Sequence, residues 1–170
     1  MASAAIMDSQ SVKTTAIAGE RGFDAAKNVT GRNRHLLVDV LGLLLTVVVS
    51  KASVPEREGA KLLLKRALAQ HFERLGLIWA DGGYTGQDFC DWVLEHCGWL
   101  LEIVKRRDDA KGFVVLPRRW VVERTFDWLY RFRRLSKDYE VLPQTSEAWT
   151  YAAVVRIMLQ RLARDPVVYL

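Results

Sequence analysis

Hydrophobic residues form short runs in some segments of this chain and recur every three or four positions in others. The first pattern predicts strands and the second predicts helices. Residues 4–14 and 75–80 contain Ile, Val, Thr and Trp in short runs without a helical stripe, so we expect a strand in each. Two apolar runs within residues 35–50 are split around Leu41 and Gly42, which predicts a hairpin buried on at least one face. Residues 99–105 (WLLEIVK) predict a further strand.

Three other segments repeat their apolar residues every three or four positions, which is the spacing of one helix face. The first helix is expected after the capping-box spacing from Ser53 to Glu56, with Gly76 at its end. The second follows the similar spacing from Thr85 to Asp88 and extends to about residue 98. A last helix can be capped by Thr145 or Ser146. Its apolar stripe is most simply core packing and consists of Tyr151, Val154, Val155, Met158 and Leu162.

Two segments show neither the pattern of a strand nor that of a helix. Residues 16–34 are rich in Gly, Asn, Arg and Lys and contain few large apolar side chains, so we expect a long polar loop or flap there. Residues 106–117 predict a polar turn and a short extended piece that ends in Pro117.

The segment 118–137 (RRWVVERTFDWLYRFRRLSK) predicts a helix with two different sides. Its core-facing side is expected to carry Val121, Val122, Thr125, Trp128, Leu129, Phe132 and Leu135. The opposite side carries Arg119, Glu123, Asp127, Tyr130, Arg134 and Lys137, so that Glu123 lies among cations and a phenol. This side suits a polyanion, but it also fits a solvated surface with intrahelical ion pairs such as Glu123 with Arg131. Trp120 lies off the apolar stripe and is a candidate for stacking on a base.

Composition limits the classes of protein that fit. The chain has 170 residues, 50% of them hydrophobic and 26% charged, which predicts one globular domain over residues 1–170. Its net charge of +5 suits a nucleic acid or an anionic surface. The longest apolar run is shorter than the ~20 residues of a membrane helix, so we expect no membrane partner. Cys90 and Cys97 lack a second ligand pair for zinc, and they fit a reducing cytoplasm.

Two aspartates lie in or directly after a predicted strand, and their side chains could take part in a site on the sheet. Asp8 lies in the middle of the first strand, where it could instead pair with Lys13 or hold a turn. Asp81 follows the strand of residues 75–80 and precedes two glycines, so the backbone can turn away and leave it exposed. Ligands gather outside the carboxyl ends of strands in open α/β sheets. A simple turn aspartate is the alternative for Asp81.

The predicted order is strand, hairpin, helix, strand, helix, strand, helix, helix. This is the order of an RNase H-like α/β fold, a mixed five-stranded sheet with flanking helices. In that arrangement Asp8, Asp81 and Glu123 converge, because the first strand is central, the strand before Asp81 lies beside it and the helix of Glu123 crosses their ends. Three clustered carboxylates suit two Mg²⁺ ions that act on a phosphodiester. Asp8 would hold both ions, Asp81 one and Glu123 the other.

Three blocks carry a resemblance to a known family: Asp8-Ser-Gln-Ser-Val-Lys-Thr, Trp79-Ala-Asp-Gly-Gly-Tyr and Arg118-Arg-Trp-Val-Val-Glu-Arg-Thr-Phe-Asp-Trp-Leu. Together they resemble the DDE transposases of bacterial insertion-sequence family five, within the wider four/five group. The resemblance implies an RNase H-like domain that uses Mg²⁺, with Mn²⁺ as a substitute, to cleave the ends of an insertion sequence and join them to target DNA. It also implies a homo-oligomer on DNA, in the cytoplasm and on the nucleoid when bound.

The family's signature around its last acid is only partly matched. Arg119 and Glu123 agree with it, but Leu116 stands at the Tyr position and Tyr130 at the Lys position. Arg134 or Lys137, expected on the same helical face, are candidates for the missing cation. The candidate DNA-binding residues are therefore Arg119, Trp120, Tyr130, Arg131, Arg134 and Lys137. His35, beside the hairpin, is a further candidate for contacting a phosphate.

Full transposases of this kind look longer, with an N-terminal region that recognises the terminal repeats. This chain begins almost at the first catalytic strand, so we expect that region to be missing. The alternative function is therefore a catalytically silent fragment that binds DNA or a full-length transposase. Metal-dependent cleavage separates the two hypotheses, because both predict salt-sensitive DNA binding.

Overall fold

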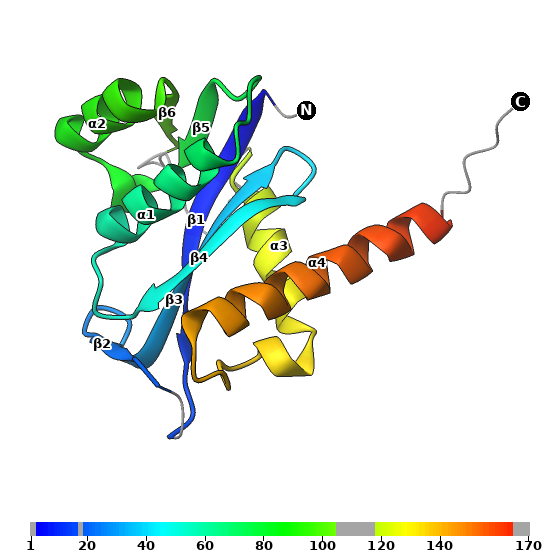
Figure 1. Ribbon diagram of the computed structural model, residues 1–170. Helices are drawn as coiled ribbons and strands as arrows, with labels where there is room; N and C mark the ends of the chain where they lie inside the picture. The colour runs from blue at the N-terminus through cyan, green and yellow to red at the C-terminus, as the bar shows by residue number, and fades with distance from the viewer. Residues whose placement is uncertain (1–2, 17–18, 105–117, 165–170) are drawn as a thin grey trace, which may run out of the picture.

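The computed structural model describes residues 3–16, 19–104 and 118–164 and contains a mixed sheet with helices on both faces (Figure 1). The expected turn and extended piece at 106–117 lie outside the described residues. The strands are β1 (Ala4–Lys13), β2 (Gly22–Asp24), β3 (Val29–Asp39), β4 (Leu44–Lys51), β5 (Leu77–Ala80) and β6 (Leu100–Ile103). The helices are α1 (Glu56–Ala69), α2 (Gln87–Cys97), α3 (Trp120–Tyr130) and α4 (Pro143–Arg164), with short 3₁₀ turns at η1 (Gly82–Tyr84) and η2 (Arg133–Leu135).

The predicted central position of the first strand is confirmed. β1 pairs antiparallel with β3 on one side and parallel with β5 on the other, and β6 continues the parallel half of the sheet. β4 pairs antiparallel with β3, so the hairpin expected around Leu41 and Gly42 is present. Gly42 has a φ of +80°, which a residue without Cβ adopts at little cost. The sheet has six strands rather than five, because the short β2 also pairs with β3.

Two apolar layers enclose the sheet, and the alternation along β1 explains them. Ala5 and Met7 pack in the cluster that includes the buried faces of α1 and α2, whereas Ile6 packs in the cluster with α3 and α4 (Figure 1). Each face of the central strand therefore supports one layer of helices. No helix within residues 3–16, 19–104 and 118–164 is both long and apolar enough to cross a bilayer.

The expected polar loop over residues 16–34 is wrong for about half of its length. β2 occupies Gly22–Asp24, and β3 begins at Val29 and runs through three polar residues that are nearly fully buried, Arg32, Asn33 and Arg34. The two guanidinium groups are buried because they donate to backbone carbonyls more than 100 residues away. Arg32 donates to Glu140 O (2.9 Å) and Val141 O (2.7 Å), and Arg34 donates to Leu135 O (2.6 Å).

The expected capping boxes are also absent. Pro55, with φ −56° and ψ 143°, occupies the N-cap of α1 without a side-chain hydrogen bond, so Glu56 stands too early to close a box with Ser53. α2 begins after Gly86, whose φ of 152° keeps it outside the helix, and Thr85 does not cap it. α4 begins at Pro143, before the expected caps Thr145 and Ser146.

Three helices differ from the sequence pattern in extent, and the first is α1, which ends at Ala69 and not at the expected Gly76. The helix expected over 118–137 ends at Tyr130, and after an extended Phe132 the chain forms the 3₁₀ turn η2. Leu135 is nevertheless buried, so its apolar spacing was informative although the backbone is not a continuous helix. α4 runs past the sheet, and the second half of its stripe is exposed, with Leu162 at 65%. The prediction that this whole stripe is core was wrong (Figure 1).

Candidate active site

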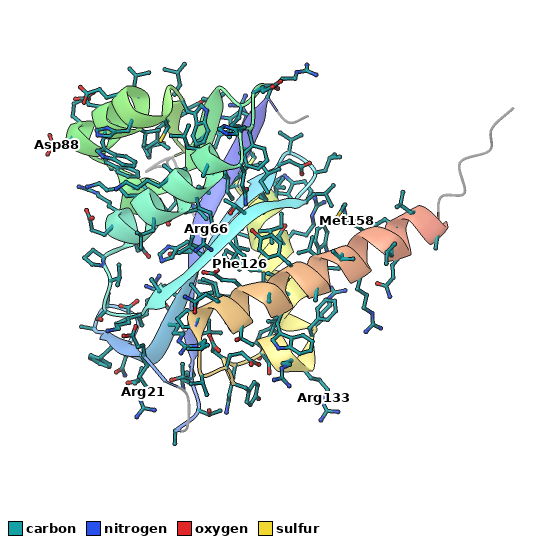
Figure 2. All side chains as sticks on the ribbon, in the orientation of Figure 1. Arg21, Arg66, Asp88, Phe126, Arg133 and Met158 are labelled. Atoms are coloured by element: carbon teal, nitrogen blue, oxygen red, sulfur yellow. The ribbon has the colours of Figure 1, made fainter. Side chains whose placement is uncertain are left out.

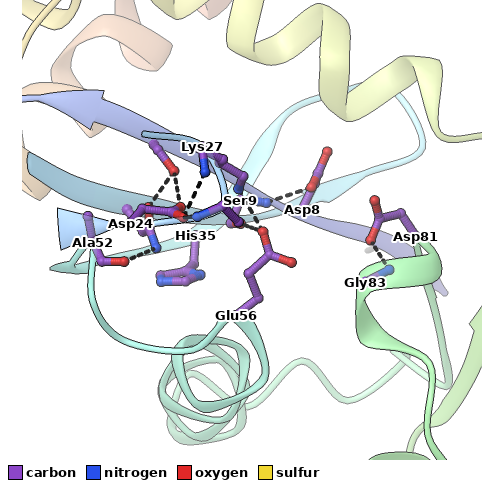
Figure 3. Close-up of polar contacts among 12 residues, drawn as sticks. Asp8, Ser9, Asp24, Lys27, His35, Ala52, Glu56, Asp81 and Gly83 are labelled. Carbon is purple, nitrogen blue, oxygen red and sulfur yellow. Dashed lines mark hydrogen bonds and ion pairs between the residues drawn. The ribbon is translucent and has the colours of Figure 1, made fainter. Parts of the chain in front are cut away.

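Asp8 and Asp81 are brought together by the parallel pairing of β1 with β5. Ile6 is paired with Trp79 in that register, so Asp8 and Asp81 each stand two residues further along adjacent strands. Side chains two residues apart in a strand share a face. Both aspartates therefore extend toward the α3 side of the sheet, where Ile6 and Trp79 are buried (Figure 3).

Local hydrogen bonds fix the two carboxylates. Asp8 Oδ1 accepts from the backbone N–H of Ser9 (2.7 Å). Asp81 follows β5 directly and is the N-cap of η1, where its Oδ1 accepts from the N–H of Gly83 (2.9 Å, Figure 3). The second oxygen of each aspartate remains available, and each of these oxygens faces the same guanidinium group.

That guanidinium belongs to Arg119, and it joins all three predicted acids. Arg119 Nη2 lies 3.9 Å from Asp8 Oδ2, 3.5 Å from Asp81 Oδ2 and 3.3 Å from Glu123 Oε1. Glu123 follows Arg119 by one turn at the start of α3, so both side chains reach the sheet edge from the same helix end. The convergence of Asp8, Asp81 and Glu123 around one nitrogen atom is the central feature of the site.

Burial makes Asp8 electrostatically unusual. Its pKa is raised to about 7, chiefly because burial desolvates the carboxylate and also because Asp81 and Glu123 are negatively charged, whereas the Ser9 N–H and Arg119 lower the pKa. Only 17% of the Asp8 side chain is exposed, compared with 52% for Glu123. An ionised Asp8 thus depends on nearby positive charge, which Arg119 supplies in part.

The donor set fits a hard divalent cation. Carboxylate oxygens are the ligands that Mg²⁺ prefers, and the three acids come from three separate elements around one point. As the side chains stand, the described residues contain no group of three or more acidic, His or Cys side chains close enough to hold a metal ion. Arg119 lies between the acids, so the three carboxylates could close on a cation only after its guanidinium moved aside.

The other predicted site residues are distributed differently. Trp120, Tyr130, Arg131, Arg134 and Lys137 are all exposed. Arg134 pairs with Glu140 (2.8 Å) and stacks on Trp149, so it is held by those residues and not by the three acids. Because α3 ends at Tyr130, Arg134 and Lys137 do not continue the helical face of Glu123, and that argument for a replacement cation was wrong.

Sequence reasoning missed a polar cluster on the opposite side of β1. Lys27 Nζ lies 2.7 Å from Glu56 Oε1, and the Ser9 hydroxyl donates to the same oxygen at 3.4 Å (Figure 3). The only available signal was that Glu56 begins a helix, and it was taken for a cap. His35, a candidate for contacting a phosphate, is 1% exposed and bonds through Nε2 with Ser50 Oγ (2.9 Å), so it cannot do so.

Comparisons of the sequence and of the fold match this chain to known proteins. Residues 1–158 match the family described as Transposase DDE domain. A putative transposase for insertion sequence element IS402 from Burkholderia cepacia is 32% identical over 116 residues, which cover 65% of this chain and 54% of that protein. The chain thus spans about half the length of this relative. The catalytic core domain of BIV integrase has a similar fold, with a TM-score of 0.50 and 15% identity over 91% of this chain and 82% of that one.

Proposed function

Since this chain belongs to the transposase DDE domain family, we propose that it cleaves DNA phosphodiester bonds at Asp8, Asp81 and Glu123 and transfers the cleaved strands. The convergence of these three carboxylates on Arg119 carries the proposal. The sequence match and the fold support a transposase or recombinase. Strand transfer of an insertion sequence to target DNA, by a homo-oligomer on paired ends in the cytoplasm, is the finer part that we propose.

Two Mg²⁺ ions, or Mn²⁺ in their place, would supply charge stabilisation for the attacking and leaving oxygens of the phosphodiester when bound. Asp8 would hold both ions from the rigid central strand, Asp81 one and Glu123 the other. Asp8 is the residue most dependent on this charge, because burial and the neighbouring carboxylates together raise its pKa to about 7. Arg119, once released from the acids, has its donors free for a phosphate oxygen.

The remaining candidate DNA contacts flank this centre. Trp120 is exposed at the start of α3, and Tyr130 and Arg131 are exposed at its end. Arg134 and Lys137 follow in and after η2. We propose that these side chains hold the DNA on both sides of the reacting phosphodiester, with the cations binding backbone phosphates.

A second candidate function is a catalytically silent fragment that binds DNA or a full-length transposase. The position of Arg119 favours it, because this guanidinium already occupies the point where the three carboxylates would hold a cation. The three acids favour the enzyme instead, since a binding fragment has no need of them.

The decisive experiment is strand cleavage of labelled duplex DNA that carries the ends of the element encoding this chain, with Mg²⁺ or Mn²⁺. The wild-type chain is compared with Asp81→Ala and with the control Asp88→Ala, which changes an exposed aspartate at the start of α2. We expect metal-dependent nicking in the wild type and in Asp88→Ala but a loss of at least about 100-fold in Asp81→Ala.

Absence of nicking in the wild type, with salt-sensitive DNA binding intact, would instead support the silent fragment. The assay would then be repeated with the full-length relative from Burkholderia cepacia.

A further inference from the structure

A dense group of arginines lies on the α3–α4 side of the molecule, beyond the three acids. Arg131 stands at the end of α3, Arg133 and Arg134 lie in η2, and Arg156 and Arg161 lie on α4 (Figure 2 labels Arg133). Within the described part of the chain, only Arg134 among these five has an acidic partner within 4.0 Å, which is Glu140. This concentration of positive charge exceeds what the neighbouring carboxylates neutralise.

Aromatic rings hold several of these guanidinium groups in place. Arg161 stacks over Trp128 at 4.3 Å, Arg134 over Trp149 at 4.6 Å and Arg156 over Phe132 at 5.8 Å. A guanidinium that stacks on a ring keeps its N–H edge free for bidentate hydrogen bonds. The stacking therefore orients the donors before any ligand arrives and lowers the entropy lost on binding.

The same residues line two adjoining hollows between the end of α3 and α4. Their volumes are about 470 and 490 Å³, and they share Arg131, Phe132 and Arg156. We call the two hollows together the Arg–aromatic groove. Arg124 contributes at one end: it stacks on the face of Trp128 as well as on Trp120, and its pKa is lowered by burial and by the charge of Arg161. Such crowding of like charges favours an anionic partner.

We propose that the Arg–aromatic groove binds the sugar–phosphate backbone of duplex DNA next to the cleavage site. This inference rests on the proposed function, because α3 joins the two places: Arg131 follows Glu123 by eight residues, about 12 Å along a helix axis. Trp128 has a guanidinium group on it from Arg124 and another from Arg161, so its ring is not available for stacking on an unpaired base. The described lining contains one side-chain amide, that of Gln160, and its many Arg donors suit phosphates of any sequence.

The test measures DNA binding without cleavage, so that it does not depend on the catalytic acids. The probe is a labelled duplex of arbitrary sequence, about 30 base pairs long, titrated with the whole chain by fluorescence anisotropy without divalent metal, between about 50 and 200 mM salt. The test variant is Arg156→Gln with Arg161→Gln. We expect affinity at 100 mM salt to fall about tenfold or more and the slope of log K against log salt to decrease by about 2.

A matched control lies on the other face of the molecule. Lys61 and Lys65 on α1 also place cations over an aromatic ring, that of Trp92, at 5.6 and 5.9 Å. Lys61→Gln with Lys65→Gln removes the same charge and should leave the salt slope close to that of the wild type. If the two double variants lose the same affinity and slope, net charge explains the binding and the Arg–aromatic groove is not the DNA site.

A second variant guards against misfolding and separates charge from stacking. Arg156→Lys with Arg161→Lys keeps the charges but loses the planar fork, so we expect the salt slope of the wild type with a several-fold weaker affinity. All variants should melt within a few degrees of the wild type, since these side chains are not in the core. Wild-type binding in both Arg156/Arg161 variants would overturn the inference, as would a change in oligomeric state without a change in DNA binding.

The outcomes also separate this inference from the proposed function. A smaller salt slope in the Gln variant together with no nicking by the wild type would establish the Arg–aromatic groove and favour the silent fragment over the enzyme. Metal-dependent nicking by the wild type together with an unchanged salt slope in the Gln variant would support the enzyme and refute the Arg–aromatic groove as a DNA site.

Discussion

Arg119 occupies the point where the charges of Asp8, Asp81 and Glu123 meet. It lowers the repulsion among three acids, one of which has a raised pKa because it is buried. A divalent cation would need the same oxygens. The guanidinium therefore stabilises the metal-free site and would compete with a divalent metal ion for these oxygens.

We expect Arg119→Gln to bind Mn²⁺ more tightly than the wild type does, by about tenfold, which corresponds to ~1.4 kcal/mol of competing attraction. The reason is that the amide carries no charge with which to hold the three carboxylates. Isothermal titration of the DNA-free protein measures the dissociation constant directly.

Arg118→Gln is the matched control for this titration. Arg118 is adjacent in sequence, but it pairs with Glu102 (3.5 Å) and stacks over Trp79, so it should leave metal affinity unchanged. Equal or weaker Mn²⁺ affinity in Arg119→Gln would show that Arg119 helps to build the metal site and does not compete for it.

For single residues, the sequence predicted that Asp8, Asp81 and Glu123 converge. Each of them stands in a recognisable sequence block, and each has a place in a predicted strand or helix, or directly after one. It could not predict Lys27 and Glu56, which meet across 29 residues. No pattern among neighbouring residues in the sequence predicts such a pair. His35 was likewise misjudged, since its burial depends on the close approach of α1.

The packing of α1 against β3 shows how a helix comes this close to the sheet. Gly59 in α1 lies against the ring of His35 on β3: a Cβ at Gly59 would stand 2.1 Å from His35 Cε1 and 2.2 Å from Nε2. The ring cannot easily move, because it is buried and bonded to Ser50. Here the missing side chain sets the distance between a helix and the sheet.

Gly59→Ala is expected to destabilise the protein by about 1–3 kcal/mol, the usual cost of overpacking a core. Helix propensity alone predicts a gain of about 1 kcal/mol for the same change, so the sign decides between the two effects. Urea unfolding measures the free energy. Gly76→Ala is the control, because a Cβ there meets nothing within 4 Å and should change stability by less than about 0.5 kcal/mol. A stabilised Gly59→Ala variant would mean that α1 can move away from β3.

Element prediction failed where tertiary contacts override the local pattern. Polar Arg and Asn side chains predict a loop at residues 32–34, yet these residues are central in β3. Four of the five carbonyls that accept from the two arginines come from residues 135–141, and the fifth is that of Glu20. The period of α3 continued through Leu135, although the backbone leaves the helix at Arg131. Strands with apolar runs, such as β4 and β5, were predicted well because their own apolar residues indicate that they are buried.

Over the whole molecule, buried titratable groups make stability depend on pH in two opposite ways. Burial lowers the pKa of His35 to about 4, so the unfolded chain, with a pKa near 6.5, takes up the proton first as pH falls. The contribution of neutral His35 is complete above pH 6.5 and is lost between pH 6.5 and 4. Asp8 acts in the other direction, because its raised pKa weakens the folded state as pH rises from 4 to 7.

We therefore expect His35→Gln to flatten the loss of stability on acidification, removing up to about 3 kcal/mol of the change between pH 6.5 and 4. Urea unfolding at several pH values gives the slope, and the comparison is made in an Asp8→Asn background so that only one of the two groups varies. His71→Asn, at an exposed turn with φ +53°, should leave the slope unaltered. An identical slope in His35→Gln would mean that His35 titrates normally in the folded protein.

The buried arginines of β3 also bear on how the molecule is made. Arg32 and Arg34 leave the ribosome about a hundred residues before the carbonyls of Leu135, Glu140 and Val141 that accept from them. Until those carbonyls arrive, the nascent sheet holds two charged groups that cannot be buried, and the acids of β1 and β5 lack the helix that carries Glu123. Under the proposed function, a nascent chain is thus unable to cut nearby DNA until the residues through 141 have left the ribosome and folded.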